Sequence, residues 1–133
     1  MNPYEHDYLA WYHRHTHPGT PFDPRSLVEC ARAQWTDHPQ LAGAFARCTR
    51  AWDRNELYTY FNSPADRRTK RFAANLFLAH PTLGTLIVDV MTDGSIGGIE
   101  YLDRVMGHPM DIGELRMGML RSVCRDVGGR RWN

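Results

Sequence analysis

The stretch that decides the fold runs from Thr85 to Leu102 and reads Thr-Leu-Ile-Val-Asp-Val-Met-Thr-Asp-Gly-Ser-Ile-Gly-Gly-Ile-Glu-Tyr-Leu. Asp93-Gly94 lies between two β-prone runs, and this dipeptide favours a two-residue type I′ turn. Thr85–Met91 and Ser95–Leu102 are therefore predicted to pair as an antiparallel hairpin. Folding the chain on this turn places Met91 opposite Ile96, Asp89 opposite Gly98, Val88 opposite Ile99 and Ile87 opposite Glu100.

Two adjacent glycines, Gly97 and Gly98, interrupt the returning strand. Glycine weakens a strand interior unless another group packs close to the backbone there. We therefore expect a bulge at this point, or an element that lies tight on the sheet.

Two more strands are predicted upstream of the hairpin, at Leu57–Phe61 and Arg71–Leu78. Both segments are rich in aromatic or alternating apolar residues. A loop is expected over residues 62–66, and a turn at 80–84. The four strands are predicted to form an antiparallel meander in chain order.

Helices are predicted before and after this meander in the chain and are expected to pack on one face of it, which makes the fold class α+β. Asn2-Pro3 begins the first helix, which runs to about Arg14, and Asp23-Pro24 begins the second. The helical spacing of the second marks a buried face of Leu27, Val28, Ala31 and Trp35. The third has the spacing of Leu41, Ala44, Phe45, Cys48 and Trp52. A C-terminal helix is predicted over residues 111–128.

Length and composition limit the possible classes of protein. The 133 residues fit one domain, divided into a helical part (1–52), the meander (53–103) and the last helix. The net charge of +1 gives no case for nucleic acid or for an anionic membrane. Without a leader-like or membrane-spanning apolar segment, the expected location is cytoplasmic. Arg supplies 15 of the 16 basic residues, which indicates a GC-rich bacterial genome, and the three dispersed cysteines are expected to be reduced.

The middle of the chain resembles a known family. The hairpin reads Val88-Asp-Val-Met-Thr-Asp-Gly-Ser-Ile-Gly-Gly-Ile-Glu-Tyr-Leu-Asp103, and Asp53 and Leu57-Tyr58 precede it. This pattern resembles the small bacterial proteins called domain of unknown function 2283, over roughly residues 52–103. The resemblance implies a small curled antiparallel sheet and no assigned activity. Because some members look like neighbours of toxin genes, it suggests an antitoxin or immunity role by analogy.

Two carboxylates are the first candidates for chemistry. The predicted register puts Asp89 and Glu100 on one face of the hairpin, where a carboxylate pair suits acid–base work. In that alternative, His80 would assist them. The interpretation we favour places both on the solvent face. The opposite, core face then holds Leu86, Val88, Val90, Ile99 and Tyr101.

A histidine cluster near the N-terminus is the second candidate. His6 and His13 share a helix face, and His15 and His17 could join them around zinc or nickel. A short His-rich tract without further ligands also fits a solvated helix end. We predict no structural metal and no cofactor.

The predicted working surface combines tyrosines and arginines. Tyr4, Tyr8 and Tyr12 recur every four residues, and tyrosine is enriched at interfaces. The densest basic run contributes Arg67, Arg68 and Arg71.

We therefore predict a small binding or regulatory protein of the antitoxin or immunity type, without catalytic residues. Its partner would be another protein or a second copy of the chain. The alternative is a cofactor-free enzyme or small-molecule-binding protein of bacterial secondary metabolism, with a His and carboxylate in an aromatic pocket.

Overall fold

The computed structural model describes residues 18–111, so the predicted first helix and the predicted helix over 111–128 lie outside the described residues, apart from Asp111. The elements, in chain order, are β1 (Thr20–Pro21), α2 (Arg25–Gln34), α3 (Gln40–Ala46), β2 (Arg50–Ala51), β3 (Tyr58–Tyr60), α4 (Pro64–Thr69), β4 (Phe72–His80), β5 (Gly84–Met91), β6 (Ile96–Tyr101) and α5 (Leu102–Met106).

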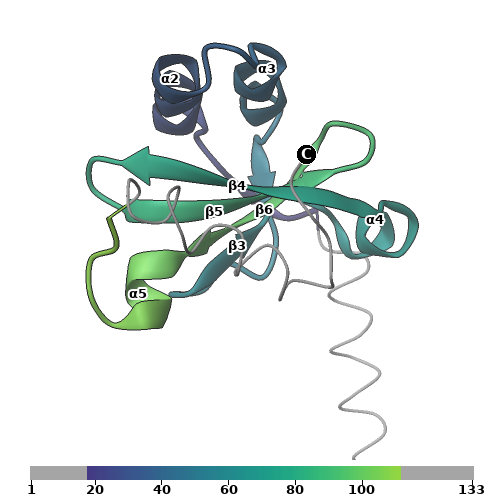
Figure 1. The fold of residues 1–133 in the computed structure, drawn as a ribbon. Helices are drawn as coiled ribbons and strands as arrows, with labels where there is room; N and C mark the ends of the chain where they lie inside the picture. The colour runs from purple at the N-terminus through teal and green to yellow at the C-terminus, as the bar shows by residue number, and fades with distance from the viewer. Residues whose placement is uncertain (1–17, 112–133) are drawn as a thin grey trace, which may run out of the picture.

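A four-stranded antiparallel sheet organises the described part, in the order β3-β6-β5-β4. The α+β class is confirmed, and β4, β5 and β6 follow one another as a meander. The first strand was predicted beside β4, but β3 pairs with β6 at the opposite edge. The reason is α4, which replaces the predicted loop and connects the two edges of the sheet (Figure 1). Ser63 caps α4, and its hydroxyl accepts a hydrogen bond from the Asp66 backbone N–H.

The predicted hairpin register is confirmed for three pairs, Asp89–Gly98, Val88–Ile99 and Ile87–Glu100. The expected bulge follows Asp89, so Ile96 pairs with Val90, and the prediction of Met91 opposite Ile96 is wrong. The type I′ turn is also wrong. Gly94 has φ of 84°, and Asp93 has no positive φ. The Asp93 carboxylate accepts hydrogen bonds from Ser95, which suits a three-residue loop ending in a left-handed glycine.

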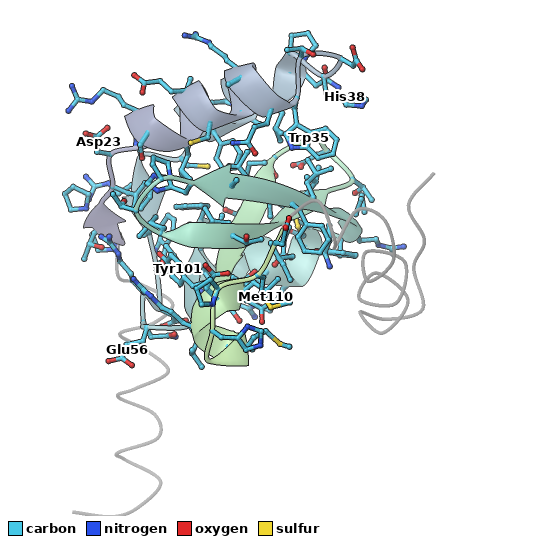
Figure 2. The ribbon with its side chains drawn as sticks, turned by 60° about the vertical axis from the view of Figure 1, so that its left-hand side comes forward. Asp23, Trp35, His38, Glu56, Tyr101 and Met110 are labelled. Atoms are coloured by element: carbon cyan, nitrogen blue, oxygen red, sulfur yellow. The ribbon has the colours of Figure 1, made fainter. Side chains whose placement is uncertain are left out.

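One face of the sheet packs against α2 and α3, which lie side by side above it (Figure 1). Leu27 and Phe45 from these helices are buried against Leu86, Val88 and Ile99. The other face carries a smaller apolar cluster that includes Leu102 of α5. Figure 2 shows Trp35 and Met110 on opposite sides of the sheet. None of the helices within residues 18–111 is long and apolar enough to cross a bilayer.

The third predicted helix ends earlier than its apolar spacing indicated. It stops at Ala46, so Cys48 and Trp52 lie beyond it. Arg50–Ala51 pairs with Thr20–Pro21, and Trp52 forms a bridge with Tyr60. These long-range backbone pairings replace the helical hydrogen bonds.

The last residue of α2, Gln34, and the next residue, Trp35, hydrogen-bond through their side chains to the backbone of the edge strand β4. The Gln34 side chain donates to the Ala79 carbonyl at 2.6 Å and accepts from the Ala79 N–H at 2.8 Å. The indole N–H of Trp35 donates to the Phe77 carbonyl at 3.0 Å. This seam fixes the helical layer to the sheet and occupies part of an open strand edge.

Candidate functional site

The face of the sheet that α2 and α3 do not cover carries two rows of side chains in register. Because side chains opposite each other in paired strands share a face, each row crosses the whole sheet. From β4 to β3, the first row is Asn75, Asp89, Gly98 and Tyr60, and the second is Phe77, Ile87, Glu100 and Tyr58.

Gly98 lets one tyrosine reach across its strand. A Cβ at Gly98 would lie 2.6 Å from the Tyr58 ring and hydroxyl. The Tyr58 ring therefore occupies the space above the Gly98 backbone, and its hydroxyl donates a hydrogen bond to the Asp89 carboxylate. The close approach expected at the glycine pair is thus made by a side chain, in addition to the bulge.

The Asp89 carboxyl group has a strongly altered protonation equilibrium. Its burial, and second the nearby charge of Glu100, raise its pKa to about 7. Burial also raises the pKa of Glu100. A carboxyl group with a pKa this close to neutral pH is suited both to donating and to accepting a proton.

The expected division of the two faces is correct for the apolar residues. Leu86, Val88, Ile99 and Tyr101 are buried in the main core, and Val90 packs against it. The two carboxylates share the other face as predicted, but they are half-buried instead of fully exposed to solvent. The apolar cluster around Phe77, Ile87 and Leu102 adjoins them on this face and accounts for part of that burial.

Asn75 contributes an acceptor without a donor. The residue is 4% exposed, and its side-chain oxygen Oδ1 is buried with no hydrogen-bond partner. Asn75 pairs directly with Asp89, which brings the Cβ atoms of such residues within about 5.5 Å. Buried polar atoms are nearly always hydrogen-bonded, so this oxygen indicates an incomplete site.

Arg67 extends the site towards α4. Its guanidinium lies 3.9 Å from the centre of the Tyr60 ring and pairs with Asp53 at 2.8 Å. Its Nε and Nη2 atoms are buried without acceptors. The Tyr60 ring in turn contacts that of Tyr58, with 4.1 Å between centroids. We call the whole set the polar stripe; it consists of Arg67, Tyr60, Tyr58, Asp89, Glu100 and Asn75.

The structure brings together residues from two separate predictions. Arg67, predicted for binding, lies in the polar stripe with Asp89 and Glu100, the alternative catalytic pair. Arg68 and Arg71 are exposed beside it, on α4 and just before β4.

His80 does not join the carboxylates. It lies five residues beyond Asn75 along β4, a separation of roughly 16 Å at the usual rise per residue. Its ring hydrogen-bonds to Ser26 on α2, on the helical side of the sheet. The sequence-based alternative combined His80 with Asp89 and Glu100, but His80 lies away from these two carboxylates.

The remaining candidates lie outside the described residues: Tyr4, Tyr8, Tyr12, His6, His13, His15 and His17. Within residues 18–111, no group of three His, Cys, Asp or Glu side chains could hold a metal ion.

Sequence reasoning missed Tyr58, Tyr60 and Asn75 as site residues. The signal for the tyrosines was their alternation in a strand, which puts both rings on one face. The signal for Asn75 was an amide within the apolar run of β4, where a buried polar side chain needs a partner.

A hollow of about 430 Å³ lies on the helical layer, away from the polar stripe. Its lining includes Arg32, Trp35 and Pro39 but no tyrosine and no carboxylate. It therefore lacks the groups expected of an acid–base pocket.

Comparison with family models, with curated proteins and with solved structures gave no match to this chain. The resemblance to domain of unknown function 2283 therefore stays a prediction, and the functional argument depends on the polar stripe.

Proposed function

We propose that this chain is a non-enzymatic binding protein of the antitoxin, immunity or regulatory type, and that the polar stripe is its working surface. The observation that carries the proposal is Arg67, whose guanidinium is stacked on Tyr60 and keeps two buried nitrogens, Nε and Nη2, without an acceptor.

Arginine and tyrosine, together with tryptophan, are the side chains that most often dominate the energy of protein interfaces. Stacking on Tyr60 and pairing with Asp53 hold the guanidinium in one orientation before a partner arrives. Such preorganisation lowers the entropy cost of association. The two buried donor nitrogens then favour a partner that supplies a carboxylate or carbonyl oxygen, because charge-assisted hydrogen bonds are the stronger ones.

The exposed neighbours of Arg67 fit the rim of such a surface. Arg68 and Arg71 extend the positive charge into solvent, where it would guide an acidic patch of the partner towards Arg67. These are two of the arginines that the sequence placed on the working surface.

One observation favours a second function. A carboxyl group with a pKa of about 7 beside another carboxylate is suited to general acid–base catalysis. In that case Asp89 would transfer the proton, with Tyr58 holding it in position. The two functions separate experimentally, because catalysis needs a small-molecule cleft at Asp89, whereas partner binding depends on Arg67.

Site-specific photo-crosslinking tests the binding function. A benzoylphenylalanine replaces Arg68, beside the stripe, in cells that naturally produce the protein, and mass spectrometry identifies the attached protein. The matched control carries the same probe at Arg47, an exposed arginine just after α3.

We expect one crosslinked protein at position 68, absent at position 47 and reduced at least tenfold by Arg67→Ala. Arg67→Lys should fail to restore it, because an ammonium lacks the planar fork. Equal products at the two positions, or a yield that Arg67→Ala leaves unchanged, would contradict the proposal.

A further inference from the structure

The second unsatisfied group of the polar stripe indicates which chemistry the partner presents. Building on the proposed function, we propose that Asn75, Asp89 and Glu100 form a receptor for one organic cation, the guanidinium or ammonium of a basic side chain on the partner.

Each of the three residues offers at least one acceptor oxygen once the acids are ionised. Asn75 contributes Oδ1, which has no donor and belongs to a side chain that is 4% exposed. Asp89 lies directly opposite it on β5, and Glu100 lies diagonally opposite Asp89 on β6. All three therefore project from one face of the sheet, with Asp89 on β5 between Asn75 on β4 and Glu100 on β6.

The described part of the chain does not supply the missing positive charge. Arg67 pairs with Asp53, and Lys70 pairs with Asp93 at 3.3 Å. No ion pair formed within residues 18–111 includes Asp89 or Glu100. The Asp89 carboxylate accepts a hydrogen bond from the uncharged Tyr58 hydroxyl.

The spread of these acceptors fits a planar donor group. Directly opposed side chains start about 5 Å apart and diagonal ones about 7–8 Å apart. A guanidinium carries five N–H donors in a fixed plane and can bridge such a set. The adjacent Tyr58 ring offers an aromatic surface of the kind that attracts cations.

The test uses a capped arginine, acetyl-arginine amide, as the probe. It is titrated into the 15N-labelled full chain at about pH 8.5, where Asp89 is ionised, while backbone amide shifts are followed by NMR. The matched neutral probe is acetyl-citrulline amide, which has nearly the same shape without the charge.

We expect saturable shifts at the amides of Asn75, Asp89, Gly98 and Glu100, with a dissociation constant in the millimolar range. Acetyl-citrulline amide should cause no comparable shift. Asp89→Asn and Glu100→Gln, which keep the size of each side chain, should each weaken binding at least fivefold. Glu29→Gln, an exposed acid on α2, should leave it unchanged. If either stripe variant fails to fold, the other one decides the outcome.

Absence of saturation up to about 50 mM probe would overturn the receptor, as would equal binding of the citrulline probe or unchanged affinity in both stripe variants. The two proposals fail separately. If the Arg67-dependent crosslink is absent but arginine still binds, the proposed function fails and the cation site stands. An intact crosslink without arginine binding removes the receptor alone.

Discussion

The two faces of the same sheet differ in whether their buried polar groups are hydrogen-bonded. On the helical face, the Thr59 hydroxyl is fully buried and hydrogen-bonded to the Tyr101 hydroxyl at 2.7 Å. On the other face, the Asn75 oxygen is equally hidden but has no partner, and Asp89 lies in surroundings that oppose its charge. A satisfied polar pair adds to stability, whereas an unsatisfied one is retained at a cost. The contrast separates a face built for folding from a face that we assign to binding.

The largest expected effect concerns the charge of Asp89. A pKa raised from 3.8 to about 7 means that the folded state binds the proton more tightly than the unfolded state. The contribution is fully present below about pH 4 and is lost as the pH rises through 7, which amounts to roughly 4 kcal/mol at most. Urea unfolding between pH 4 and pH 8.5 should show this loss in the wild type and not in Asp89→Asn. A difference between the two proteins that stays constant with pH would refute the assignment.

The next effect comes from adding a methyl group at Gly98, where the Tyr58 ring already lies close to the backbone. In Gly98→Ala, the added Cβ meets the Tyr58 ring at 2.6 Å and the Thr59 carbonyl oxygen at 2.7 Å. Because the carbonyl is backbone and cannot turn away, we expect a loss of about 3 kcal/mol in the free energy of unfolding. Gly43→Ala on α3 is the control, since its nearest neighbour is a flexible Arg47 side chain at 4.0 Å. It should be neutral or stabilising by up to about 1 kcal/mol. Equal effects at both glycines would show that the sheet yields at Gly98.

A third variant tests the helical face of the sheet, where the buried hydroxyls of Thr59 and Tyr101 are hydrogen-bonded to each other. Thr59→Val keeps the side-chain volume but leaves the Tyr101 hydroxyl without its partner, so we expect a loss of about 2 kcal/mol in chemical unfolding. A double variant with Tyr101→Phe should recover part of that loss, because both ends of the hydrogen bond are then removed. No recovery would mean that packing, and not the hydrogen bond, sets the cost.

The smallest effect should have the opposite sign. Asn75→Leu removes an unsatisfied oxygen and replaces it with an apolar group of similar size. We expect the free energy of unfolding to stay unchanged or to rise by up to about 1 kcal/mol, while binding of acetyl-arginine amide weakens. A clear destabilisation in thermal melts would instead place Asn75 among the structural residues.

The fold could be predicted from the sequence where local signals decide it. The Asp93-Gly94 turn and the alternation of Leu86, Val88 and Ile99 gave the hairpin and its buried face. The bulge shifted the register near the turn by one residue, because the Asp93 carboxylate binds Ser95 and stabilises a different loop.

Predictions that depend on distant partners were less successful. Ser63 and Asp66 form a capping box, but Asn, Ser and Pro are also typical of loops, so α4 was predicted as one. With a short loop in place of α4, the prediction put β3 beside β4 and not at the far edge of the sheet. The common face of Asp89 and Glu100 followed from the hairpin, whereas the reach of Tyr58 to Asp89 depends on the pairing of β3 with β6. No local pattern contains that pairing.

The hydrogen bonds between Gln34 and Ala79 have a consequence for behaviour at high concentration. An uncovered strand edge is a template on which other chains can add strands and begin to aggregate. Here a single amide side chain imitates one residue of a neighbouring strand, donating and accepting at the positions that an incoming chain would use. By occupying these two backbone groups, Gln34 opposes the addition of another chain to β4. Resistance to aggregation of this kind is a separate property from the stability of the isolated molecule.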